Sequence, residues 1–93
     1  MTGHGLTNTN STLSVSNSAE AYFLRGFMMH TNGQLNAAMI DYTHCIQIDP
    51  KFYAAYRNRG ILKLHEGDLS GAIADFTKAI QLTNTCDLFT IEV

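Results

Sequence analysis

Histidine and cysteine are the side chains of this 93-residue chain that could hold a transition metal or act as a nucleophile. The candidates are His4, His30, His44, His65, Cys45 and Cys86. Their spacing contains neither His-x3-His nor Cys-x2-Cys, the separations that bring two zinc ligands together. His30, His44 and His65 also fall on three different predicted helices. We therefore expect no metal site and no bound cofactor.

Motifs that support catalysis are missing from the sequence as well. It contains no nucleophile elbow, no phosphate-cradling glycine loop and no pair of carboxylates on one helix face. Cys45 stands where the repeat described below has a small residue, Ala79, which favours a buried, inert thiol over a nucleophile. We therefore predict that the protein is not an enzyme and has no catalytic residues.

Basic residues gather on the third predicted helix: Lys51, Arg57, Arg59 and Lys63. Only Arg59 and Lys63 share a helix face, no aromatic platform interleaves them, and the formal net charge of the chain is −2. No apolar run approaches the roughly 20 residues that cross a bilayer, and residues 1–17 do not form a secretory signal. These features predict a cytoplasmic protein that binds neither nucleic acid nor membrane.

A repeat of 34 residues organises the chain. Displacing the sequence by 34 places residues 19–50 on residues 53–84 with eleven identities in 32 pairs. The first members of the identical pairs are Ala21, Tyr22, Arg25, Gly26, Gly33, Leu35, Ala38, Asp41, Thr43, Ile46 and Gln47. A unit of this length holds two helices of roughly 13 residues, a turn and a short link. The sequence therefore predicts two helical hairpins, at residues 18–50 and 51–84.

Capping residues give the approximate ends of these helices. Asn17 is predicted to cap the first helix and Asp68 the fourth, while Asp49 caps a third helix that starts at Pro50. Asn32-Gly33 closes the first helix. The second and fourth helices are expected at about residues 35–47 and 69–82.

The repeated residues resemble one protein family. The first unit carries Tyr22-x3-Gly26, Gly33, Ala38, Tyr42 and Pro50, and the second carries Tyr56-x3-Gly60, Gly67, Ala72 and Phe76. This pattern resembles the tetratricopeptide repeat from Ala19 to about Asn84. The resemblance implies an all-α fold of two tandem helix-turn-helix repeats in a short right-handed solenoid. Arg25 and Arg59 depart from the usual large apolar residue, and Asn84 replaces the usual closing proline.

The resemblance also implies a site. In this family the first helix of each repeat lines a concave groove that takes a peptide of a partner protein. The matching residues are Glu20, Phe23, Phe27, His30, Arg57, Asn58, Ile61, Leu64 and His65. The family's clamp for a terminal carboxylate is incomplete, because Asn58 matches it whereas Glu20 and Leu24 do not. We therefore expect a non-enzymatic adaptor that binds a protein or peptide.

Each unusual arginine is paired with an aspartate at one sequence offset: Arg25 with Asp41, and Arg59 with Asp75. The coincidence predicts ion pairs, either within each repeat or across the junction as Arg59–Asp41.

The ends of the repeat array suggest a second functional hypothesis, self-association. Solenoids usually need three or more repeats, so the fourth helix is expected to present Ile73, Ile80 or Leu82 toward a missing neighbour. Residues 85–93 form an apolar tail or a truncated third repeat, which we expect to cover that end in its own chain or in a partner. Residues 1–17 are polar and expected to be disordered. The alternative to an adaptor is thus a homo-oligomer that associates through its open end or groove, or a short product of a longer repeat array.

Overall fold

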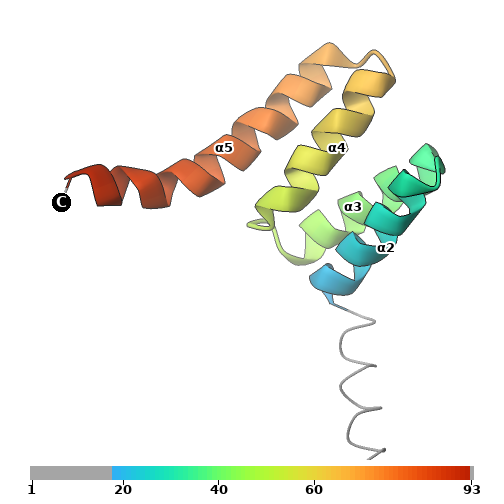
Figure 1. Ribbon diagram of the computed structural model, residues 1–93, viewed down its shortest axis with the longest axis horizontal. Helices are drawn as coiled ribbons and strands as arrows, with labels where there is room; N and C mark the ends of the chain where they lie inside the picture. The colour runs from blue at the N-terminus through green and yellow to red at the C-terminus, as the bar shows by residue number, and fades with distance from the viewer. Residues whose placement is uncertain (1–17, 93) are drawn as a thin grey trace, which may run out of the picture.

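Helices make up the whole regular structure of the part of the chain that is described. The computed structural model describes residues 18–92, with side-chain surroundings for residues 18–83, so the predicted disorder of residues 1–17 lies outside this range. The helices are α2 (Ala19–Thr31), α3 (Leu35–Ile48), α4 (Tyr53–His65) and α5 (Leu69–Glu92). α2 packs against α3 and α4 against α5, and α3 packs against α4 to join the two hairpins (Figure 1). The predicted all-α fold of two tandem helix-turn-helix units is confirmed.

Left-handed glycines close the first helix of each hairpin. The φ angle is 81° at Gly33 and 84° at Gly67, values that residues with a Cβ rarely adopt. In both turns the amide after the glycine donates to the carbonyl five residues earlier, at 2.8 Å from Gln34 and at 2.9 Å from Asp68. The two turns are built alike, as the repeat predicts.

Side-chain caps begin the first and the last helix. The Asp68 carboxylate accepts a hydrogen bond from the Gly71 amide at 2.9 Å, which confirms the predicted cap of α5. The cap of α2 is Ser18, whose hydroxyl oxygen accepts from the Ala21 amide at 3.1 Å. The prediction of Asn17 was one residue early, because neighbouring Asn and Ser side chains are equally good acceptors at a helix start.

The predicted start of the third helix was wrong. α4 begins at Tyr53, three residues after Pro50. The Asp49 carboxylate does not cap it and instead accepts from the Lys51 amide at 3.0 Å within the connecting turn. The Pro50 carbonyl accepts from the Tyr56 hydroxyl at 3.0 Å, so this turn is tied to α4 by a side chain.

Each hairpin closes by placing a glycine under an aromatic ring. A Cβ on Gly26 would lie 2.8 Å from Cε1 of Tyr42, and a Cβ on Gly60 would lie 2.9 Å from Cε1 of Phe76. Both distances are too short for ordinary contact, so glycine is what allows the helices to approach. Tyr42 and Cys45 are completely buried, which makes Cys45 the core thiol that its repeat position predicts.

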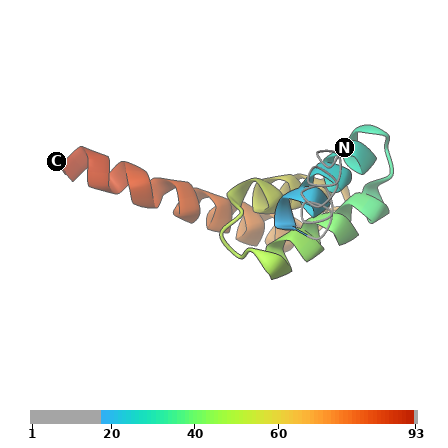
Figure 2. The ribbon, with the colours of Figure 1, turned by 90° about the horizontal axis from the view of Figure 1, so that it is seen from below.

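The predicted end of the fourth helix near Leu82 was wrong. α5 continues to Glu92 and extends away from the other helices in both views of the ribbon (Figures 1 and 2). Asn84 retains the backbone N–H that the family's closing proline lacks, so the helical hydrogen bonds continue through that position. The backbone of residues 85–92 is thus a continuation of α5 and does not fold back on the second hairpin.

Candidate partner-binding groove

The predicted groove residues lie on α2 and α4, the first helices of the two hairpins. Because the helices are related by 34 residues, equivalent positions on them face the same side of the molecule. The exposed groove residues are Glu20, Phe27, Arg57, Leu64 and His65, the partly buried ones are Phe23, His30 and Ile61, and Asn58 is buried. The surface is therefore a mixture of exposed anchors and supporting side chains.

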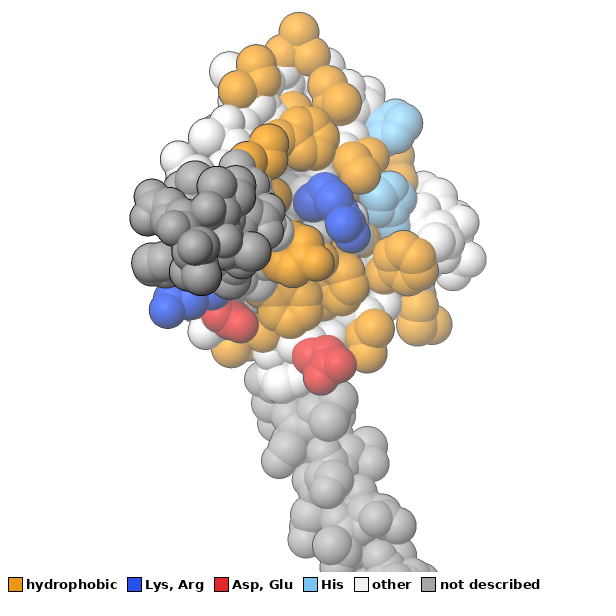
Figure 3. Space-filling view, turned by 60° about the vertical axis from the view of Figure 1, so that its left-hand side comes forward, with side chains coloured by type: hydrophobic (Ala, Val, Ile, Leu, Met, Phe, Trp, Pro, Cys, Tyr) orange, Lys and Arg blue, Asp and Glu red, His pale blue; other side chains and the backbone are white. Residues whose placement is uncertain are grey.

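Exposed apolar groups are the main feature of this candidate surface. Phe27 and Leu64 each leave about half of their surface exposed, and Ile61 occupies in the second repeat the position of Phe27 in the first. Figure 3 shows one face of the molecule on which hydrophobic side chains surround a basic side chain, with histidines beside them and acidic side chains near the edge. Exposed apolar surface rimmed by polar groups is typical of a protein-binding site.

Phe23 belongs mainly to the core beneath the groove. Its ring centroid lies 5.7 Å from that of Tyr42 and 5.1 Å from that of Phe52. These contacts join α2 to α3 and to the turn before α4, so Phe23 supports the groove more than it contacts a partner.

A row of hydrogen bonds crosses from α2 to α4 through a buried tyrosine. The Asn58 amide nitrogen donates to the Tyr42 hydroxyl at 3.4 Å, and that hydroxyl lies 3.2 Å from Nδ1 of His30. At the other end Nε of Arg57 donates to the Asn58 amide oxygen at 3.2 Å. Both ends of the Asn58 amide are thus occupied within the protein, so Asn58 orients its neighbours and is not a free ligand group.

Sequence reasoning missed the hydrogen bonds of Tyr42 beneath the candidate groove, because its repeat position predicts only a large space-filling ring. Burial raises the pKa of its hydroxyl, and the hydrogen bond from Asn58 opposes this increase only in part. The hydroxyl therefore stays protonated and can both accept and donate. One signal could have revealed this role: Phe76, at the same repeat position, lacks the hydroxyl.

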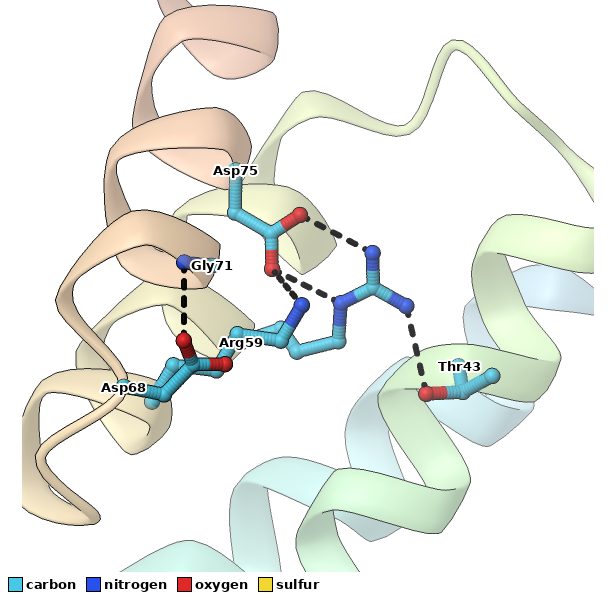
Figure 4. Close-up of polar contacts among 6 residues, drawn as sticks. Thr43, Arg59, Asp68, Gly71 and Asp75 are labelled. Carbon is cyan, nitrogen blue, oxygen red and sulfur yellow. Dashed lines mark hydrogen bonds and ion pairs between the residues drawn. The ribbon is translucent and has the colours of Figure 1, made fainter.

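Both within-repeat ion pairs are confirmed. Nε and Nη2 of Arg25 donate to the Asp41 carboxylate at 3.0 and 2.9 Å. The same atoms of Arg59 donate to Asp75 at 2.8 and 2.9 Å, and Figure 4 shows this second pair. Across the junction, Nη1 of Arg59 donates to the Thr43 hydroxyl at 3.2 Å, so the contact there is made with Thr43 and not with Asp41. The junction is therefore held by a polar contact as well as by apolar packing.

A second concave feature lies between α4 and α5, at the end of the second hairpin. It is a mainly apolar cleft of about 300 Å³, which we call the tail cleft. Its lining residues are Tyr53, Arg57, Phe76, Ala79, Ile80 and Thr83. Ile80 is one of the residues that the sequence predicts to face a missing neighbour, whereas the side chains of Leu88, Phe89 and Ile91 lie outside the described surroundings.

Three other properties bear on what the described residues can do. Burial raises the pKa of the Cys45 thiol to about 11, with a smaller contribution from the charge of Asp49, so this thiol is a poor nucleophile. Within residues 18–83, no three His, Cys, Asp or Glu side chains form a metal-binding group. No helix in the described part of the chain is long and apolar enough to cross a membrane.

Tandem helical hairpins with the same turn, the same glycine-to-ring packing and the same Arg–Asp pair define a helical repeat protein. The family model described as tetratricopeptide repeat matches residues 19–52, which span α2, α3 and the turn that follows. The match covers the first hairpin, and the four helices of the described residues are consistent with two tetratricopeptide repeats. A comparison with curated proteins finds no match. Tetratricopeptide repeats typically bind proteins or peptides and are typically not enzymes.

Proposed function

We propose that this protein is an adaptor that binds a segment of a partner protein in the groove lined by α2 and α4. The observation that carries the proposal is the half-exposure of Phe27 on α2 and Leu64 on α4, on the equivalent side of the two repeats. Each ring or aliphatic chain retains apolar surface that a partner side chain could cover. A reducing, cytoplasmic setting agrees with the buried free thiol of Cys45.

The charges of the groove favour a partner that combines apolar and acidic side chains. Arg57 is exposed and its Nε is held by Asn58, so its guanidinium is partly oriented before a partner arrives. An oriented guanidinium pairs well with a carboxylate. Glu20, also exposed, lies at the start of α2 and disfavours acidic groups there. We therefore propose that the acidic residue of the partner lies over α4 and its apolar residue over Phe27.

The experiment is selection from a displayed library of random peptides, followed by measurement of the Kd of a selected peptide. A Phe27→Ala, Leu64→Ala variant removes two half-exposed anchors, each contributing about 1 kcal/mol on burial, so binding should weaken roughly 30-fold. Arg57→Glu should remove the preference for acidic peptides. Ile40→Ala is the matched control, because Ile40 is exposed to a similar degree but lies on α3.

Circular dichroism of each variant should retain the helical signal, since the substituted side chains are exposed. If the folded double variant binds as tightly as the native protein, or if Ile40→Ala weakens binding equally, the groove is not the site.

A further inference from the structure

The residues that line the tail cleft are equivalent to those of the first hairpin that contact α4, the first helix of the next repeat. Subtracting 34 from its lining residues gives Ala19, Phe23, Tyr42, Cys45, Ile46 and Asp49. Apart from Asp49, these residues belong to or pack on the two apolar clusters that include Ala55 and Leu62 of α4. The residues that hold α4 against the first hairpin thus have counterparts in the cleft at the end of the second hairpin.

The described part of the chain does not turn back into this cleft. At the internal junction the chain leaves α3 at Ile48 and begins α4 at Tyr53. At the equivalent point α5 continues past Thr83 to Glu92, directed away from α4 (Figures 1 and 2).

The complementary face is present on α2. α4 meets the first hairpin through Ala55, Asn58, Arg59 and Leu62. The residues 34 positions earlier are Ala21, Leu24, Arg25 and Met28, which we call the head face. Leu24 is 49% exposed and Met28 is 60% exposed, whereas Leu62 is 1% exposed. The head face therefore presents two exposed apolar side chains beside Arg25, at the position through which a first helix docks.

The two ends also match each other in polarity. At the internal junction Asn58 donates to the Tyr42 hydroxyl, so both members of that contact are polar. The equivalents at the ends are Leu24 and Phe76, so both members change together to apolar side chains. If the head face had Asn in place of Leu24, or the cleft had Tyr in place of Phe76, a polar group would face an apolar one.

A second pair of equivalent residues also suits docking of the head face in the tail cleft. Nη1 of Arg59 donates to Thr43 at the internal junction, and the equivalents are Arg25 on the head face and Thr77, which is exposed on α5. The Arg25 side chain is 58% exposed, against 17% for Arg59, although both bind their aspartate in the same way. A docked copy would cover Arg25 as the first hairpin covers Arg59.

We propose that the head face of one copy of this chain docks in the tail cleft of another, so that copies associate head to tail. The contact continues the internal α3–α4 junction from one molecule to the next. Tyr53 and Arg57 stand where that junction has Ala19 and Phe23, so the docked helix lies against a larger rim. A heterologous contact of this kind forms chains of copies unless the rotation closes a ring.

Two variants that each block one end provide the test. Leu24→Glu with Met28→Glu blocks the head face, and Ile80→Glu blocks the tail cleft. All three side chains are about half exposed, so each variant should keep its helical content, which circular dichroism checks. Ile40→Glu, an equally exposed change on α3, is the control.

Sedimentation measures the mass. The native protein and Ile40→Glu should increase in mass with concentration, whereas each blocked variant should stay monomeric. An equal mixture of the two blocked variants should form a complex of two chains and stop there, since one head and one cleft remain compatible. The Phe27→Ala, Leu64→Ala groove variant should associate like the native protein, which separates this inference from the proposed groove.

Three results would overturn head-to-tail docking. The native protein could stay monomeric up to millimolar concentration. The folded blocked variants could remain monomeric when mixed, although the native protein associates. Either blocked variant alone could associate as strongly as the native protein, which would indicate a symmetric or different interface.

Discussion

The two Arg–Asp pairs allow the energies of two similar ion pairs to be compared within one protein. Arg25–Asp41 and Arg59–Asp75 have the same sequence separation and nearly the same hydrogen bonds, and the aspartate side chains are equally buried at 6% exposure. They differ in the arginine: 58% of the Arg25 side chain is exposed but only 17% of Arg59. A difference between their coupling energies therefore reports mainly on burial of the arginine, together with the added contacts of Arg59 with Thr43 and of Asp75 with Lys63.

We predict that coupling between Arg59 and Asp75 stabilises the fold by about 2 kcal/mol, because hydrogen bonds to charged groups contribute about 1.5–3 kcal/mol when water is largely excluded. The coupling between Arg25 and Asp41 should be below about 1 kcal/mol, as is usual for a pair with one solvated partner. Lys63 also lies 3.1 Å from Asp75 and remains in every variant. Asp75→Asn alone should therefore cost more than Arg59→Gln alone.

The assay is a double-mutant cycle for each pair, with Arg→Gln and Asp→Asn substitutions and urea unfolding followed by circular dichroism. The protein is kept dilute, since docking of a second copy would bury Arg25 and raise the coupling in its pair. Equal coupling energies in the two cycles, or a larger value for Arg25–Asp41, would refute the argument that burial of the arginine decides the energy.

Three further predictions concern pH and packing. Burial acts to raise the pKa of Asp75, but Arg59 and Lys63 outweigh it and hold that pKa below the ordinary 3.8. The contribution of Asp75 to stability is therefore present above pH 4 and is lost as the pH falls through the lower pKa of the folded state. Melting curves between pH 2 and 6 should show this loss in the native protein and not in Asp75→Asn. The pKa of Cys45 is raised from 9.0 to about 11, so stability should fall as the pH rises from 9 toward 11. Cys45→Ala should reduce this slope in melting curves and leave the part that comes from the raised pKa of Tyr42. Gly60→Ala should cost about 1–3 kcal/mol in urea unfolding, because its Cβ would lie 2.9 Å from the Phe76 ring, and a second change of Phe76→Leu should recover part of the loss.

Much of this fold could be predicted because its period carries geometric information. Gly33 and Gly67 are needed where φ is positive, and the Arg–Asp pairs were visible because both partners repeat at one offset. The end of α5 could not be predicted in the same way. Asn84 is compatible with a helix or a turn, so whether the helix ends there depends on the surrounding sequence and not on the repeat position.

The groove was predicted less completely than the fold. Repeat position indicates which helix face a residue occupies but not how deeply its side chain is buried. Asn58 illustrates the difference, since it is buried and both ends of its amide make hydrogen bonds within the protein, to Tyr42 and from Arg57. The partner of Asn58 lies on α3, 16 residues away, and the hydroxyl that Tyr42 has and Phe76 lacks is the one sequence signal that points to this contact.

One pair of repeat positions has the reverse of the polarity that a monomeric solenoid requires. An array that ends in water normally has polar outer faces and apolar internal junctions. Here the internal junction includes the polar contact of Asn58 with Tyr42, whereas the equivalent end positions are Leu24 and Phe76. If both ends faced only water, polar groups such as the Tyr42 hydroxyl and the Asn58 amide would increase solubility more at the ends than at the internal junction. The apolar ends are instead suited to contact with another helix, and the matching change on both ends favours a second copy of the same chain over an unrelated partner.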